Sequence, residues 1–210
     1  MSFAQSQETL TIPLFPLGIV LFPGGRHDLQ IFEQRYIDMV TSSLKNDTPF
    51  GLCSLQSGQE TRAPGTCQSV SRIGTLARII DWNSLDNGLL GITIEGTTKF
   101  RVDNCWQAES DLLMAEVTLS AEDRLEAEPV AFGEGYEALV EVLKGLEGHP
   151  LVAEKNLAID HDNLWHLGWH LSELMPLDGA EKQGLLELDD AQLRADRLLE
   201  LLRELSGEDS

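Results

Sequence analysis

Three histidines within ten residues form the densest group of potential metal ligands in the sequence. His161, His166 and His170 lie in the segment HDNLWHLGWH, and the last two would share one face of a helix. A zinc protease helix carries glutamate directly after its first histidine as the general base, whereas position 167 is leucine. Only Glu173 or Asp162 could supply a third ligand nearby. We therefore expect no bound metal and interpret the histidines as a helix–helix contact, with an enzymatic or metal-binding site around them as the alternative.

Motifs for nucleotide hydrolysis and for covalent catalysis are absent from the sequence. No G-x-x-x-x-G-K-[S/T] loop is present, and no G-x-S-x-G segment would expose a serine nucleophile. The paired acids Asp189-Asp190 fit the start of a helix better than acid–base chemistry, because carboxylates are stabilised there. We expect no cofactor, no ATPase activity and no catalytic residue.

The charge balance argues against two classes of partner. The chain carries 35 acidic and 15 basic residues, for a net charge of −20. Such a chain repels a phosphate backbone, so neither nucleic acid nor an anionic membrane is an expected partner. The three cysteines, Cys53, Cys67 and Cys105, have no C-x-x-C spacing, which favours reduced thiols and a cytoplasmic location.

The apolar stretch at residues 12–25, IPLFPLGIVLFPGG, is too short and too broken for a membrane helix. Pro13, Pro16 and Pro23 each lack a backbone donor, so the stretch cannot form one continuous helix. It lacks the basic start and cleavage site of a secretory signal. We expect extended chain that bends at the prolines and turns at Gly24-Gly25.

The hydrophobic period changes near residue 120, which predicts two subdomains. Residues 10–119 read as short strands, with a helix at 33–45 whose apolar face includes Leu44. Asn87-Gly88 predicts a type I′ hairpin turn, and the polar residues 56–69 a flexible loop. An acidic linker is expected at 120–128. The expected strands are at residues 30–32, 50–55, 72–82, 89–96, 99–102 and 113–119.

Residues 129–205 carry the helical period. Pro129 is placed in a first helical turn, and Gly148-His149-Pro150 ends that helix. A second helix is expected at 163–174. Capping patterns then start two more helices, Asp178 with Glu181 and Asp189 with Gln192. In the last helix, the side chains expected to be largely solvated are Arg194, Arg197, Glu200 and Arg203.

Several segments in order resemble the N-terminal, substrate-binding domain of Lon protease, over about residues 10–205. The matching segments are IPLFPL (12–17), VLFPGG (20–25), IFEQRY (31–36), IGTLARI (73–79), GITIEGTTKFRV (91–102), EKQGLLELDD (181–190) and RLLELL (197–202). The resemblance implies an α+β fold: a β-rich, PUA-like pseudo-barrel followed by a helical subdomain. Full-length Lon also has ATPase and protease domains, which the 210 residues do not contain.

The resemblance implies a binding module that acts on other polypeptides without chemistry of its own. Its expected partners are unfolded or client polypeptides, as in a protein quality-control adaptor, or one specific folded protein. An exposed strand edge with apolar neighbours would bind such segments. The candidate contact residues are Phe15, Phe22, Phe32 and Tyr36, although large apolar residues of β domains usually lie in the core.

Overall fold

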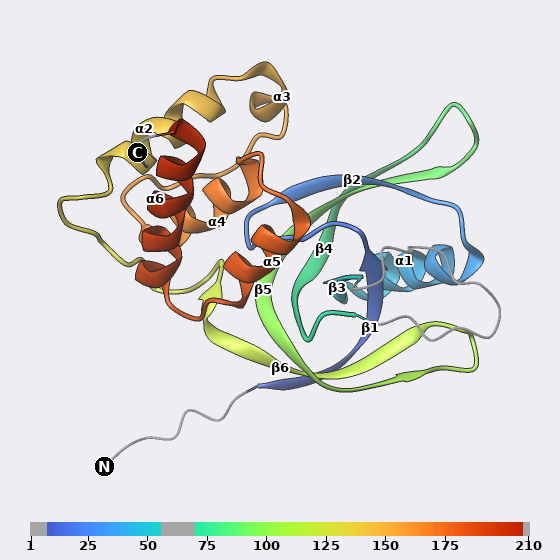
Figure 1. Ribbon diagram of the computed structural model, residues 1–210. Coiled ribbons are helices and arrows are strands. Elements are labelled where there is room, and N and C mark those ends of the chain that lie inside the picture. The colour runs from blue at the N-terminus through green and yellow to red at the C-terminus, as the bar shows by residue number, and fades with distance from the viewer. Residues whose placement is uncertain (1–7, 56–69, 208–210) are drawn as a thin grey trace, which may run out of the picture.

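The computed structural model describes residues 8–55 and 70–207, which form a β-rich half and a helical half (Figure 1). The first half contains the helix α1 (Gln34–Asn46) and the strands β1 (Thr9–Leu17), β2 (Arg26–Ile31), β3 (Phe50–Ser54), β4 (Ile73–Ser84), β5 (Leu90–Gln107) and β6 (Leu113–Arg124). The second contains α2 (Glu137–Glu147), α3 (Pro150–Ala153), α4 (Leu164–Leu174), α5 (Gly179–Glu187) and α6 (Ala191–Ser206). The expected α+β class is confirmed. The predicted loop at residues 56–69 lies outside the described residues.

The sheet closes into a barrel because β5 pairs with strands on both halves of its length. The strand order is β2-β5-β4-β3-β1-β6, and β6 pairs with β5 again. Residues 90–95 of β5 pair with β2, whereas residues 98–107 pair with β6. The β1–β3 pair is parallel and the other pairs are antiparallel. In the part of the chain that the structure describes, β2 therefore lies outside the closed ring and pairs with β5 alone.

The proline-broken apolar stretch is extended chain, as predicted, and forms β1 and the turn after it. Pro13 lies where β1 pairs with β6 only, and Pro16 lies where it pairs with β3 only. Each proline can therefore direct its missing donor away from the paired side. Ile12, Leu14 and Phe22 are buried, so this segment is core rather than anchor. No helix among the described residues is long and apolar enough to span a membrane.

Helix α1 packs its apolar face into the barrel on the side away from the other helices (Figure 1). Tyr36, Met39 and Val40 are buried against the strands, as the helical spacing predicts. Leu44, expected on the same face, is 42% exposed because the buried face of α1 continues through Ser43 instead.

The β4–β5 hairpin is confirmed, but its turn is not the predicted type I′. Gly88 has a φ of 81°, whereas Asn87 is not among the residues with positive φ. The Gly88 N–H donates to Leu85 O at 2.8 Å, and the Leu85 N–H donates to Leu89 O at 2.9 Å. The hairpin therefore uses a longer loop with a single left-handed glycine, which also matches the twist of the strands. The segment expected as a separate strand at 99–102 is the continuation of β5.

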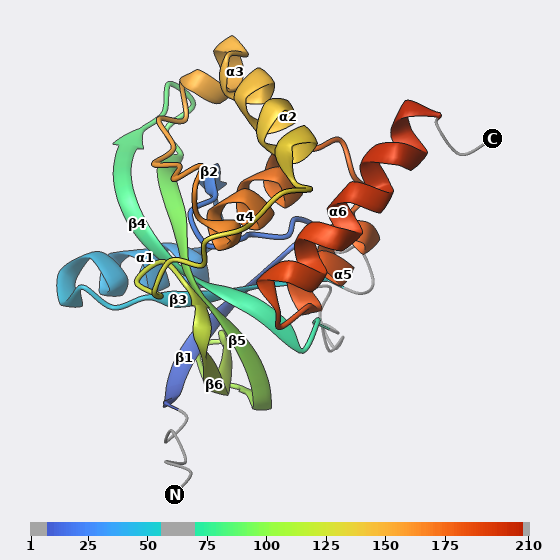
Figure 2. The same cartoon turned by 90° about the vertical axis from the view of Figure 1, so that its left-hand side faces the viewer.

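The helical half begins later than the sequence predicts. Strand β6 runs through residues 120–124 of the expected linker, and α2 starts at Glu137 rather than at Pro129. Residues 129–136 remain non-helical because they pair with the start of α4: the Leu164 N–H donates to Val130 O at 2.7 Å. Helix α4 is buried on nearly all sides by α2, α5 and α6, which Figure 2 shows around it at one end of the barrel.

Candidate functional site

The structure brings three of the four candidate aromatic residues to one pocket beside β2. Phe15, Phe32 and Tyr36 line this pocket of about 160 Å³, together with Leu17 and residues 28–31 of β2. Phe32 follows directly after the strand, and its side chain is 60% exposed. Phe15 and Tyr36 are buried, with ring centroids 4.2 Å apart, so they form the base of the pocket. Phe22, by contrast, is fully buried in the core of the helical half and cannot contact a ligand here.

Tyr36, which lines the same pocket, carries a hydroxyl that can donate a hydrogen bond. Burial raises the pKa of Tyr36 to about 12, although the charge of Arg35 lowers it, so the phenol keeps its proton at neutral pH. No described residue forms a hydrogen bond with this hydroxyl. Phenol groups usually have a partner when buried, and the free donor therefore gives this apolar pocket one point of polar recognition.

The ladder between β2 and β5 leaves alternate main-chain groups of β2 facing away from the sheet. The Gly96 N–H donates to Gly25 O at 3.0 Å. In an antiparallel ladder every second residue forms such hydrogen bonds, so the main-chain groups of the next residue of β2 point away from β5. Arg26 therefore faces outward, and its carbonyl accepts a hydrogen bond from Lys155 Nζ at 2.8 Å. By the same alternation, the main-chain groups of Asp28 and Gln30 face away from β5 beside the pocket.

The three histidines do not converge on one point. The His161 Nε2 contacts Glu147 Oε2 at 2.6 Å, and His166 Nδ1 accepts from the Asp160 N–H at 3.1 Å. His170 points elsewhere, toward the Gly24 turn: a Cβ added at this glycine would lie 2.9 Å from its Cε1. Within residues 8–55 and 70–207, no three His, Cys, Asp or Glu side chains are placed to hold a metal ion.

The possible third ligands of a histidine site have other roles. Glu173 accepts a hydrogen bond from the Phe22 N–H at 3.3 Å and pairs with His27. It thus fixes the turn before β2 against α4. Asp162 donates its main-chain N–H to Asp160 in the loop before α4. The geometry gives the metal-site alternative no support. The helix–helix interpretation is wrong for His170, which packs against the Gly24 turn and has no described hydrogen-bond partner at either ring nitrogen.

A buried charge network joins the two halves, and sequence analysis does not find it. Asp123 at the end of β6 accepts hydrogen bonds from Trp169 Nε1 and Arg194 Nη2, each at 2.6 Å. Lys99 of β5 lies 2.8 Å from the same carboxylate and also 2.8 Å from Asp189. Arg194 is fully buried, contrary to the expectation that it is solvated. Two cations and two carboxylates thus meet at the junction.

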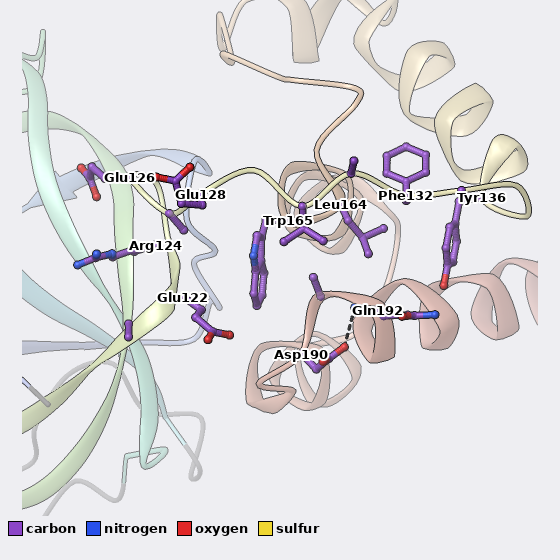
Figure 3. Close-up of a pocket in the computed structure, with 16 residues that line it drawn as sticks. Glu122, Arg124, Glu126, Glu128, Phe132, Tyr136, Leu164, Trp165, Asp190 and Gln192 are labelled. Carbon is purple, nitrogen blue, oxygen red and sulfur yellow. Dashed lines mark hydrogen bonds between the residues drawn. The ribbon is translucent and has the colours of Figure 1, made fainter. Parts of the chain in front are cut away.

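A larger cavity of about 690 Å³ lies where β6, the connection 125–136 and the first turns of α4 and α6 meet (Figure 3). The labelled side chains come from all four segments, and Trp165 stands between the acidic side chains of β6 and α6. Asp190 at its edge accepts from the Gln192 N–H at 2.8 Å and caps α6. The capping residue is therefore Asp190, because the predicted cap, Asp189, is drawn to Lys99.

Comparison with known proteins gives consistent results in sequence and in structure. A sequence model of the ATP-dependent protease La (LON) substrate-binding domain matches residues 11–204. A Lon N-terminal domain protein from Xanthomonas campestris has a similar crystal structure, with a TM-score of 0.71 and 29% identity, covering 90% of this chain and 97% of that chain. The N-terminal domain of Lon protease from the Mycobacterium avium complex shares the fold, with a TM-score of 0.61 and 17% identity over 91% of this chain and 97% of that chain.

Two full-length relatives align with the chain over most of its length. The Lon protease of Cytophaga hutchinsonii is 29% identical and covers 91% of this chain, and Lon protease 2 of Myxococcus xanthus gives the same two values. The alignments cover 24% and 23% of those relatives, so the chain spans about a quarter of their length. The match is confined to the part of Lon that binds substrate. The chain belongs to the Lon substrate-binding domain family.

Proposed function

We propose that this chain is a non-catalytic module that binds extended segments of unfolded or client polypeptides along the open edge of β2. The observation that carries the proposal is the coincidence of three features at β2: outward-facing main-chain groups, an apolar pocket and the exposed ring of Phe32. Membership of a substrate-binding domain family supports the same class of ligand. In the cell, the chain would hold a client polypeptide for another protein, as a quality-control adaptor does.

A bound segment would add one strand to the sheet. Main-chain groups of Asp28 and Gln30 would pair with the peptide backbone, which gives affinity without demanding a particular sequence. The adjacent pocket, about 160 Å³, is close to the roughly 150 Å³ cavity that accommodates benzene, so it suits a single apolar side chain. It is smaller than the roughly 300–1,000 Å³ typical of cofactor sites. The Tyr36 hydroxyl would donate to a carbonyl of the bound segment.

The start of β2 sets one end of the proposed groove. Arg26 Nη1 donates to Lys155 O at 3.1 Å and to Asn156 O at 2.8 Å, so the loop after α3 covers this end of the strand. The pocket and Phe32 lie at the other end. A peptide would therefore lie along residues 28–32, with one or two of its side chains against the pocket.

The test is a titration of a fluorescently labelled, permanently unfolded protein, followed by anisotropy at low and high salt. We expect micromolar or weaker affinity that persists at high salt, because apolar and main-chain contacts are little screened. Phe32→Ser should weaken binding about fivefold to tenfold, since one exposed aromatic contact contributes about 1 kcal/mol or more. The matched control is Leu205→Ser in α6, which removes an apolar side chain that is 55% exposed and lies outside the proposed groove.

A second variant tests the main-chain contribution. Gln30→Pro removes an outward N–H while leaving the ladder to β5 intact, so the circular dichroism spectrum should be unchanged and binding should fall. Binding that is unaffected by both Phe32→Ser and Gln30→Pro would exclude the β2 edge. Absence of binding to any unfolded protein would instead favour docking to one specific folded partner, and turnover of peptide or ATP by the pure chain would contradict a non-catalytic role.

A further inference from the structure

The cavity at the junction of the two halves has features that the proposed peptide site at β2 does not explain. It shares no lining residue with the β2 pocket, and its volume of about 690 Å³ is in the range of ligand sites. Its apolar surface comes from the connection 125–136 and from the first turn of α4. The apolar lining residues are Val130, Phe132, Leu164 and Trp165.

The cavity carries a strong excess of negative charge. Glu122, Glu126, Glu128 and Asp190 line it, against one cation, Arg124. No described residue forms an ion pair with any of the three glutamates, whereas Asp190 is occupied as the helix cap. The net charge of −20 strengthens the field of this group. The charge therefore favours a cationic ligand and repels anions and nucleic acids.

Trp165 adds an unpartnered hydrogen-bond donor to the same cavity. Its side chain is only 3% exposed and lines the cavity, yet no described residue accepts a hydrogen bond from its indole N–H. Figure 3 shows the ring with its nitrogen on the side that faces β6 and Glu122. Trp169, one turn further along α4, instead donates its indole N–H to Asp123 at 2.6 Å. The indole nitrogen is not among the buried polar atoms that lack a partner, so the N–H is open to the cavity, where a ligand carbonyl can replace water as its acceptor.

The ring of Trp165 is already fixed by its neighbours, which makes the N–H a preorganised donor. One contact is the stacking on Trp169, with centroids 5.7 Å apart, and another is the Arg194 guanidinium, 5.4 Å from the ring centroid. Because these contacts occupy the ring, the polar edge is the part of Trp165 left for recognition. Preorganised donors bind with little loss of conformational entropy.

We propose that this cavity binds a basic peptide segment, in which lysine or arginine side chains approach Glu122 and Glu128 and a main-chain carbonyl accepts the Trp165 N–H. A peptide of this kind combines the two required features, positive charge and a neutral acceptor. The site is separate from the β2 edge and does not depend on binding there. It makes basic segments a distinct class of ligand.

The test follows the indole N–H signals of the four tryptophans by ¹H–¹⁵N NMR, with Trp165→Phe assigning the signal of interest. The probe is an acetylated, amidated peptide of alternating lysine and alanine. We expect the Trp165 signal to move downfield as its N–H acquires an acceptor, while Trp82 and Trp106 do not move. The matching glutamate–alanine peptide should cause no shift. Equal shifts with both peptides, or no shift at millimolar peptide, would overturn the proposal.

Two variants measure the contributions of the donor and of the charge. Trp165→Phe retains the stacked ring and should weaken binding of the basic peptide about fivefold, the value of one neutral hydrogen bond. Trp106→Phe is the matched control and should leave the affinity unchanged. The double variant Glu122→Gln, Glu128→Gln should weaken binding and reduce its salt dependence. If this double variant binds as tightly as the wild type, the charge argument is wrong. Gln30→Pro should bind the basic peptide normally, which separates this site from the β2 edge.

Discussion

His170 is a fully buried imidazole whose two ring nitrogens have no hydrogen-bond partner among the described residues. It contacts the Gly24 turn and lies 5.7 Å from the ring of His166, measured between centroids. Burial is the main reason that the pKa of His170 falls to about 3, and the positive charges of His166, His161 and Arg26 lower it further. The neutral imidazole packs in the core, and its contribution to the free energy of unfolding therefore depends on pH.

We expect His170 to make the protein less stable as the pH falls below 6.5. Its folded pKa lies below the unfolded value, so the unfolded state takes up the proton first. Between pH 7.5 and pH 5 this group alone should reduce the free energy of unfolding by about 2 kcal/mol. His170→Leu should remove that part of the slope in denaturant titrations at several pH values. The control His149→Asn, at an exposed helix cap, should keep the slope; a slope unchanged by His170→Leu would contradict the assignment.

The residues of the β2 pocket and of the junction network are only partly accessible from sequence. Phe32 and Tyr36 are predicted contacts because apolar residues beside a strand can bind a peptide, but their sequence positions do not distinguish them from the buried Phe22. Arg194 is predicted to be solvated because the buried stripe of the last helix is placed on Leu198, Leu202 and Leu205, and this placement is wrong at Leu205, which is exposed. The helical phase of Arg194 with Ala191, Leu198 and Leu201, which are all buried, is the signal that places it inward. Its carboxylate partner Asp123 is 71 positions away, and this pairing depends on tertiary structure.

At the scale of elements, β5 is organised around Gly96, where it changes its pairing partner from β2 to β6. The Gly96 N–H donates to Gly25 O, and its own carbonyl accepts from the Gly24 N–H at 2.9 Å. A Cβ at this position would lie 2.2 Å from Phe22 O, closer than any allowed contact. The glycine therefore allows the turn before β2 to lie directly against the bend of the longest strand.

Gly96→Ala should destabilise the protein by about 2 kcal/mol or more, because the backbone of Phe22 cannot move without disturbing the core. Gly145→Ala, in the last turn of α2 with nothing within 4 Å of the added methyl group, should instead stabilise by up to about 1 kcal/mol. Chemical denaturation of the two variants beside the wild type measures both changes. Equal effects of the two substitutions would show that the close approach at Gly96 is not important.

Local patterns predicted the elements better than their ends. The capping box of Asp178 and Glu181 is present, because both partners lie within one turn of α5. Asp189 and Asp190 have equal capping propensity, and the choice between them is made by Lys99 on a distant strand. Pro129 could have started a helix, but the segment after it pairs with α4 instead. The predicted ends of these elements are wrong where a tertiary contact competes with a local preference.

At the scale of the whole molecule, the network around Asp123 joins the barrel to the helical half. Trp169 and Arg194 reach it from α4 and α6, and Lys99 reaches it from β5. Arg194 also donates to Leu185 O at 2.9 Å and to Leu188 O at 2.6 Å, which holds α5 in place. The two halves therefore share polar contacts that neither could satisfy alone, and we expect them to unfold as one cooperative unit.

Asp123→Asn should lower the free energy of unfolding by about 3–5 kcal/mol, because Lys99 and Arg194 would keep their buried charges with a single exposed carboxylate, Asp189, left to balance them. Asp103→Asn, which alters an exposed ion pair with Arg101, is the control and should cost less than about 1 kcal/mol. Unfolding followed by far-ultraviolet circular dichroism and by tryptophan fluorescence measures both. A wild type whose two probes give separate midpoints would disprove the cooperative coupling.

The pairing of β1 with β6 also determines the order in which the protein can assemble while it is being made. Thr9 lies opposite Thr118 in this ladder, so the ribosome must add more than a hundred residues before the first strand meets its second partner. At about 5–20 residues per second, that interval lasts roughly 5 to 20 s. During it, the apolar residues of β1 remain partly uncovered. The nascent chain is therefore most vulnerable to aggregation immediately before β6 emerges, and closure of the ring ends that exposure.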